Sequence, residues 1–286
     1  MSKFTSSPSL ILAFLLFAFG CSYDAPEEEG IDYYKTVNIA DSLGLNNGEA
    51  TVFLLPAPLQ VVTALKLHEV PYSALLISDI EEHKGNDVEY KNALNLGINT
   101  IDMGYATVNG DLQLGLSYSQ NVKALMEELG ITSAVTGNMI ERIEANGTNQ
   151  DSLSKIILEA YGASHAFFQS NQREGMGLLI LTGCFIEGLY LTSSADQLSS
   201  NSQVQSLLGI HKEYLENLLL LIGFYNHNEE VSTLIDDLKQ LKDEFYSVDL
   251  AVNIEKGSAK LNSPVSEIKI ASIRSKIIAI RNRIRA

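Results

Sequence analysis

A chain of 286 residues with 45% hydrophobic residues is long enough to bury a sizeable core, and a net charge of −15 disfavours nucleic acid as a partner. It has only two cysteines, Cys21 and Cys184. The charge is uneven, because residues 256–286 hold eight Lys or Arg and a single acid, Glu267. The rest of the chain is therefore even more acidic than the total suggests.

Residues 1–20 are predicted to be a lipoprotein signal peptide. The apolar stretch 10–19 (LILAFLLFAF) has the length of a signal-peptide core and is too short for a membrane span, which needs ~20 residues. It ends in Gly20-Cys21, which resembles the lipobox of bacterial lipoproteins, although Phe17 or Ala18 stands where leucine is usual. We predict a lipid on Cys21. The alternative is an ordinary signal peptide followed by a chance cysteine.

Residues 21–50 are predicted to be the lipid-anchored cysteine followed by an acidic tether or loop. The segment 22–30 (SYDAPEEEG) is acidic and contains Pro and Gly, as a solvated tether does. It loosely resembles the signal that directs some Bacteroidota lipoproteins to the cell surface, and a plain spacer is the alternative. We expect the lipid bilayer as partner through Cys21, and a location in the cell envelope, on the periplasmic or surface face of the outer membrane.

Residues 51–286 are predicted to be a helical domain. Apolar residues recur there at spacings of three and four, which places them on one face of an α-helix. We expect helices over residues 59–67, 72–82, 89–108, 111–129, 132–145, 151–169, 175–194, 203–225 and 229–245, and a last one capped by Ser263-Pro264. No segment shows sustained alternation of apolar and polar residues. The pattern therefore predicts an all-α fold, a multi-helix bundle of nine or ten helices.

The run 175–195 is apolar enough to be considered as a membrane span. Glu187 would then lie near the middle of the bilayer, at a cost of roughly 2.5–3.5 kcal/mol for a charged side chain. We therefore expect this run to be a central core helix. Cys184 lies in it and is expected to be a small buried hydrophobe.

Several segments together resemble a group of uncharacterised helical lipoproteins from Bacteroidota. The segments are Leu55-Pro56-Ala57-Pro58, then Ala93-Leu94-Asn95-Leu96-Gly97-Ile98 with Asp102, Tyr105 and Ala106, and Gly183-Cys184-Phe185-Ile186-Glu187-Gly188-Leu189-Tyr190. Phe185 stands where that group has tryptophan, and the match spans roughly residues 50–195. The resemblance implies an all-α envelope protein and no particular activity.

Glu187 is the most unusual residue of the helical region. It is the only charged residue between Glu174 and Asp196, and burial of a lone carboxylate costs several kcal/mol, roughly, unless it is paired or protonated. Asp102 is the second candidate, and Tyr105 and Tyr190 complete a candidate buried polar site. Facing carboxylates would suit acid/base work or cation binding. The alternative is a hydrogen-bond network that fixes helix register, for instance Glu187 with a Tyr hydroxyl or an Arg.

Polar residues at helical spacing lead up to Asp102: Asn92, Asn95 and Asn99. They form either a solvated face or a polar seam. His211 lies on an apolar stripe and is expected to be a core histidine, and none of the five histidines falls in a metal-binding pattern. No metal or cofactor is expected, and no motif for a known reaction is present.

Two functions remain open for this chain. The first is a membrane-anchored envelope lipoprotein with a non-catalytic binding or scaffolding domain, whose partner is another envelope protein. The second is a small-ligand or cation binder, or an enzyme, that uses Glu187 and Asp102 in the bundle core. A solvent-connected cavity at Glu187 would favour the second, and a dry, hydrogen-bonded Glu187 would favour the first.

The basic tail, residues 264–286, is predicted to pack back on the body beside residues 229–245. Its apolar face is a narrow stripe of five isoleucines spaced three and four apart, which matches the narrow stripe of the acidic segment 229–245. The cations would then face acidic surface or solvent. The alternative is a basic amphipathic helix that lies on an anionic membrane.

Substitution of the anchoring cysteine tests the lipoprotein prediction. Cys21→Ser removes the thiol that carries the lipid, so the protein should move to the soluble fraction or remain unprocessed. Cell fractionation and intact mass of the product are the measurements. A membrane-bound protein of mature mass after Cys21→Ser would contradict the prediction.

Overall fold

Helices form where the apolar spacing of three and four residues persists, and they account for most of the described chain. The computed structural model describes residues 59–78, 80, 88–132, 173–196, 198–223, 229–246 and 265–286, with isolated residues between 142 and 171. The signal peptide, Cys21, the tether and nearly all of the helices expected at 132–145 and 151–169 lie outside these residues. The described residues contain seven α-helices, one short 3₁₀ turn and no strand, so the all-α fold is confirmed.

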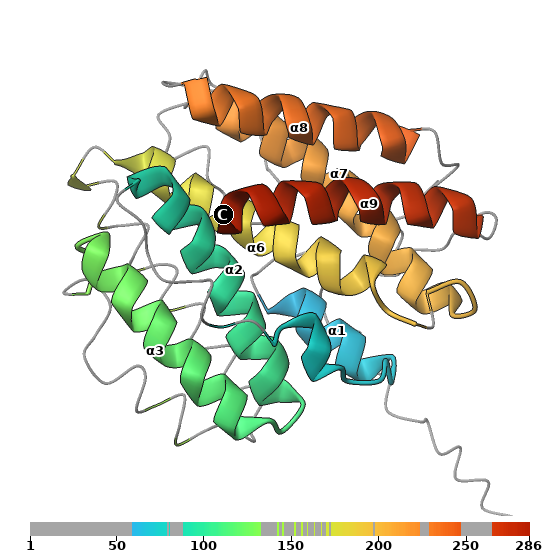
Figure 1. Ribbon diagram of the computed structural model, residues 1–286, viewed down its shortest axis with the longest axis horizontal. Helices are drawn as coiled ribbons and strands as arrows, with labels where there is room; N and C mark the ends of the chain where they lie inside the picture. Colours follow the sequence, from blue (N-terminus) through green and yellow to red (C-terminus); the bar gives the residue numbers. More distant parts are fainter. Residues whose placement is uncertain are drawn as a thin grey trace, which may run out of the picture. The chain divides into compact units, whose positions relative to one another are not determined.

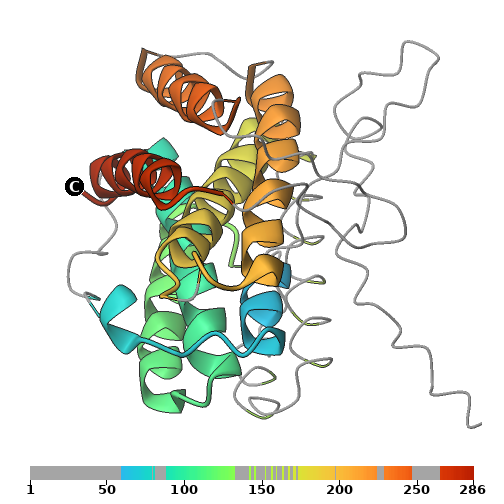
Figure 2. The same ribbon diagram turned by 90° about the vertical axis from the view of Figure 1, so that its right-hand side faces the viewer.

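The α-helices have bounds close to those expected from the apolar pattern. They are α1 (Gln60–Leu67), α2 (Glu89–Val108), α3 (Leu112–Glu128), α6 (Glu174–Ser193), α7 (Ser202–Gly223), α8 (Glu229–Tyr246) and α9 (Glu267–Arg285), with the 3₁₀ turn η1 (Ala74–Leu76) between α1 and α2. Helix α6 contacts α1, α2, α7 and α9, and α3 packs on α2 (Figure 1). Figure 2 shows α6 between α7 and α9 from the side.

Helices α2 and α6 approach so closely that their backbones touch. A Cβ added to Gly97 would lie 2.1 Å from the carbonyl oxygen of Ile180, and one added to Gly183 would lie 2.0 Å from that of Leu94. Only glycine, which lacks a Cβ, permits this separation. The glycines of the two apolar helices therefore determine where α2 and α6 cross.

Helix α6 is apolar on all sides because it is surrounded. It is the one helix in the described part of the chain that is long and apolar enough to cross a membrane, from Gly175 to Ser193, and 78% of that segment is buried inside the protein. Glu187 and Thr192 are buried with it. Its apolar surface is thus covered by neighbouring helices, as expected for a core helix.

The basic tail packs as predicted. Helix α9 contacts α8 and also α6 and α2, and it lies between α8 and α6 in Figure 1. All five isoleucines of its stripe are buried, namely Ile270, Ile273, Ile277, Ile280 and Ile284. Burial of a side chain of this size contributes about 1.5–3 kcal/mol, so the stripe supplies most of the attachment.

Two expected helical segments differ from the structure, and tertiary hydrogen bonds explain both. The helix expected at residues 72–82 is reduced to the turn η1, because the Tyr118 hydroxyl donates to the Ile77 carbonyl and the Ser73 amide donates to the Tyr105 hydroxyl. In an α-helix the Ile77 carbonyl would accept the N–H of the residue four positions later, so its bond to Tyr118 competes with the helix. The bond to Tyr105 holds Ser73, whose backbone is extended and not helical. Residues 79 and 81–87 lie outside the description.

The last helix begins later than the Ser263-Pro264 cap predicts. The backbone N–H of Val265 donates to the Gln205 side chain over 3.3 Å, and Ser266 has extended backbone angles. Helix α9 therefore starts at Glu267, once the buried Val265 has been fixed against α7. Ser263 and Pro264 themselves lie outside the described residues.

A methyl group at the α2–α6 crossing should be strongly destabilising. Gly97→Ala places a Cβ against a backbone carbonyl that cannot move without shifting α6, and overpacking of this kind costs typically 1–3 kcal/mol or more. Gly223→Ala is the matched control, because nothing lies within 4 Å of its added Cβ. Chemical denaturation should show a large loss for Gly97→Ala alone. Equal effects of the two substitutions would contradict the close crossing.

Candidate functional site

Glu187 lies at the centre of the bundle and is bound by an arginine. Its side chain on α6 is 0% exposed, and Arg281 of α9 is 6% exposed. The Nε–H of Arg281 donates to one carboxylate oxygen at 2.5 Å, and Nη2–H donates to the other at 2.9 Å. This two-bond geometry is the strongest arrangement available to a guanidinium and a carboxylate. The prediction that Glu187 is buried with a polar partner on another helix is confirmed.

Arg281 is the residue that the sequence analysis missed. The tail's cations were expected to face acidic surface or solvent. This expectation is wrong for Arg281, because its side chain is buried. It holds for Arg283, which pairs with Asp237. The spacing of Arg281 from the isoleucines of the stripe could have predicted its burial. Position 281 follows Ile277 by four residues and precedes Ile284 by three, so it shares their buried face.

Asp102 of α2 lies next to this pair and is fully buried. No donor in the described part of the chain reaches either of its oxygens. Burial, followed by the neighbouring negative charge of Glu187, raises the pKa of Asp102 well above its usual range, and Arg281 only partly opposes this. This shift favours the protonated form of Asp102. When Asp102 is protonated, it donates to the Glu187 carboxylate, and the two facing carboxyl groups then hold one negative charge between them.

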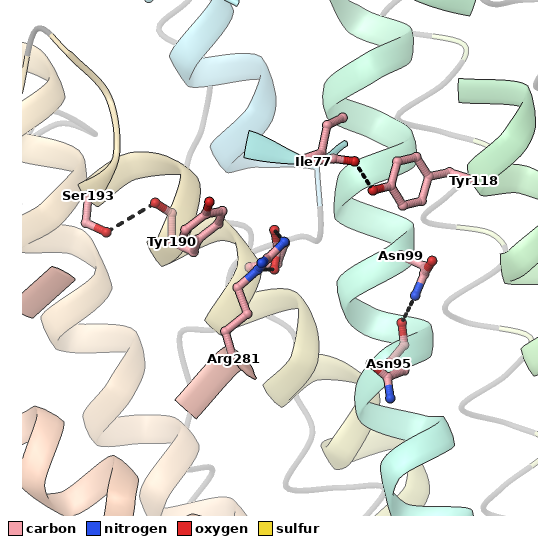
Figure 3. A network of polar contacts seen from close by, with 8 residues as sticks. Ile77, Asn95, Asn99, Tyr118, Tyr190, Ser193 and Arg281 are labelled. Carbon is pink, nitrogen blue, oxygen red and sulfur yellow. Dashed lines mark hydrogen bonds and ion pairs between the residues drawn. The ribbon is translucent and has the colours of Figure 1, made fainter. Parts of the chain in front are cut away.

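The two candidate tyrosines have different roles. Tyr190 covers the ion pair, because the Arg281 guanidinium lies 4.1 Å from the centre of the Tyr190 ring, and Figure 3 shows the two side chains side by side. Tyr105 is engaged elsewhere: its hydroxyl accepts the Ser73 N–H at 3.1 Å, and its ring packs on Tyr72 at 5.0 Å. The structure thus brings Glu187, Asp102 and Tyr190 together with Arg281, and uses Tyr105 to hold the loop before η1.

The asparagine stripe on α2 is a buried polar seam and not a solvated face. Asn92 donates to the Glu128 carboxylate of α3 at 2.8 Å, and Asn95 donates to the Ile284 carbonyl of α9 at 3.2 Å. Asn99 donates to the Asn95 carbonyl and accepts from Asn121 of α3 (Figure 3 shows the first contact). The seam therefore fixes the positions of α3 and α9 along α2.

His211 and Cys184 are core residues, as expected. His211 places Nδ1 2.7 Å from the Leu207 carbonyl, and burial lowers its pKa from 6.5 to about 4, so it is neutral at pH 7. Its Nε2 atom has no hydrogen-bond partner in the described chain. Burial raises the pKa of the Cys184 thiol to about 12, which makes it unreactive.

A pocket opens on the outer side of the ion pair. Its volume is about 620 Å³, and it is lined by Leu75, Leu76, Ser78, Tyr190, Arg281, Asn282, Arg285 and Ala286. Arg281 thus has one edge on Glu187 and another on the pocket. The carboxylates of Glu187 and Asp102 are not part of the lining, because Arg281 and Tyr190 stand in front of Glu187.

These features define an α-helical bundle whose core is tied together by a carboxyl, a carboxylate and a guanidinium from three helices. Among the described residues, no group of three His, Cys, Asp or Glu is placed to hold a metal ion. Comparison with family models, with curated proteins and with solved structures found no match to this chain.

Loss of the Glu187 carboxylate should cost far more stability than a surface charge. Glu187→Leu leaves Arg281 buried without a counter-ion, which costs about 3–5 kcal/mol in the free energy of unfolding. Glu187→Gln keeps the shape and a hydrogen-bond acceptor and should cost less. The double substitution Glu187→Leu, Arg281→Met removes both charges and should recover most of the loss. Asp237→Asn, at the partly exposed pair with Arg283, should cost less than about 1 kcal/mol.

Chemical denaturation of the parent and the four variants under identical conditions gives the free energy of unfolding of each. Small and equal losses from Glu187→Leu and Glu187→Gln would contradict a buried ion pair.

Asp102 should make the protein less stable as the pH rises. The folded state keeps the Asp102 proton at pH values where the unfolded chain has lost it, so the free energy of unfolding falls from the ordinary pKa of 3.8 upward to the raised pKa. Asp102→Asn donates the same hydrogen bond without titrating. The variant should therefore gain stability over the parent as the pH increases.

The difference between variant and parent should be measured from about pH 4 to pH 8.5, because the effect begins at the ordinary pKa of 3.8. His211 acts in the opposite direction between about 4 and 6.5, but both proteins contain it, so its contribution cancels in the difference. A difference in stability that does not change with pH would show that Asp102 is ionised in the folded protein.

Proposed function

We propose that this chain is an envelope lipoprotein, held to a membrane by a lipid on Cys21, whose helical body is a non-catalytic binding or scaffolding module. The observation that carries the proposal is the buried pair between Glu187 and Arg281. Glu187 was the best candidate for a reactive carboxylate. Its two oxygens are occupied by Arg281, and it is not exposed to solvent. A dry, paired Glu187 supports a structural role.

The rest of the proposal follows from the sequence. The body would contain nine helices, the seven described ones and those expected at 132–145 and 151–169, which lies within the expected nine or ten. Its acidic charge favours a protein partner in the envelope over nucleic acid. The lipobox-like Cys21 and the resemblance to helical Bacteroidota lipoproteins support the outer membrane, on its periplasmic or surface face.

A second candidate function is the binding of a small ligand. The pocket beside Arg281 favours it, because its volume of about 620 Å³ falls within the range of ligand sites. The ligand would contact Arg281 and Tyr190 and would not reach Glu187 or Asp102 directly. Cation binding at the two carboxyl groups is disfavoured, because Arg281 already supplies the positive charge there.

Position-specific photocrosslinking in intact cells tests the first proposal. A photoreactive residue at the exposed Leu220 of α7 or at the exposed Lys239 of α8 should capture a defined envelope protein. The same label in a Glu187→Gln background should capture the same protein, since the substitution keeps the fold. Capture that is lost in this background, with the fold intact by circular dichroism, would place the function in the buried cluster and favour the alternative.

A further inference from the structure

A second pocket lies where α2, α8 and α9 meet, near the C-terminal end of α9 (Figure 1). Its volume is about 210 Å³. Its floor consists of buried apolar side chains from all three helices, namely Leu94, Leu234, Ile280 and Ile284. Its rim consists of more exposed side chains, namely Tyr90, Lys91, Glu230, Thr233, Asp237 and Arg283. None of these described residues also lines the pocket beside Arg281, so the two pockets are separate.

The size of this second pocket suits one small apolar group. In another protein, a cavity of about 150 Å³ lined by Leu, Ile and Phe side chains binds benzene. A pocket of about 210 Å³ therefore accommodates a single six-membered ring or a short branched chain. The aliphatic floor removes the surface of such a group from water, which stabilises the complex.

The rim carries a cation and an anion that are not ion-paired. Arg283 and Asp237 line the pocket as a closed pair. Lys91 of α2 and Glu230 of α8 line the same pocket, but in the described part of the chain neither forms an ion pair. Burial, followed by the charge of Glu230, raises the pKa of Tyr90, so the Glu230 carboxylate lies close to α2 across the rim. A partly buried ammonium without a counter-ion favours an anionic group on a ligand, and Glu230 favours a cationic one.

We infer that this second pocket binds a free α-amino acid whose side chain is a single ring or a short branched chain. The side chain occupies the apolar floor, the carboxylate pairs with Lys91, and the ammonium pairs with Glu230. A purely apolar molecule leaves both charges of the rim without a partner, and a simple anion meets the carboxylate of Glu230 as well as the ammonium of Lys91. The inference goes beyond the proposed function, because the site involves neither the lipid anchor nor the buried cluster around Glu187.

A matched series of small molecules tests the inference on the purified full chain. Phenylalanine and leucine are the probes, and isothermal titration calorimetry should give a dissociation constant of about 1 mM or below for at least one of them. Three controls each lack one part of phenylalanine. Phenethylamine lacks the carboxylate, 3-phenylpropionate lacks the ammonium, and glycine lacks the side chain. The first two should bind at least about threefold more weakly, since each loses one partly exposed ion pair, and glycine should not bind.

Substitutions at the rim localise the binding. Lys91→Gln and Glu230→Gln each remove one charge from the lining and should weaken the affinity for the probe by about threefold or more. Glu229→Gln makes the same charge change one residue earlier on α8, outside the described lining, and should leave the affinity unchanged. Thr233→Phe introduces a ring into the pocket and should abolish binding, with the helical content unchanged by circular dichroism.

Three results would overturn the inference. The first is the absence of binding by both probes at about 10 mM, a concentration at which even ~1 mM affinities are detected. The second is binding of phenethylamine or 3-phenylpropionate as tight as that of phenylalanine, which would mean that the rim charges take no part. The third is an equal loss of affinity from Glu229→Gln and Glu230→Gln, which would mean a general effect of net charge. Each result leaves the proposed anchoring and partner capture intact, because those are measured in cells with Cys21→Ser and the crosslinking labels.

Discussion

Burial of charge is the constraint on which the arrangement of the core helices depends. A carboxylate within α6, inside an apolar core, is tolerated only if a cation reaches it, and Arg281 must come from a helix that packs directly on α6. Asp102 on α2 adds a third helix to the same point. Because the hydrogen-bond geometry tolerates little displacement, the pair fixes the position of α9 along α6 in a way that a stripe of isoleucines alone cannot.

The polar seam and the glycine crossing act together with this pair. Gly97 and Gly183 set the separation of α2 and α6, and Asn95 of α2 binds the Ile284 carbonyl on α9, close to Arg281. If the core contained aliphatic side chains alone, two helices with similar apolar stripes could pack at several positions along each other's axis. Here directional contacts join α2 to α3 and α9, and α6 to α9, so a shifted register would leave buried polar groups unpaired.

The sequence predicted elements better than it predicted partners. Apolar spacing located seven helices and the packing of the tail, because that spacing directly reflects burial. It identified Glu187 and Asp102 as anomalies, because a charge in an apolar run needs an explanation. It failed for Arg281, since arginine on a basic tail is usually solvated, and for residues 72–82, where hydroxyl groups of Tyr105 and Tyr118 take backbone bonds. Contacts between distant residues are not encoded in local spacing.

The separation of Glu187 and Arg281 along the chain has a consequence for biogenesis. The two residues are 94 positions apart, and at 5–20 residues per second a ribosome needs roughly 5–20 s to synthesise that distance. During this interval α6 carries an uncompensated carboxylate, so its core is incomplete and its apolar surface remains available to chaperones. The core around Glu187 can therefore close only after α9 has been synthesised, so α6 is expected to fold late, together with α9.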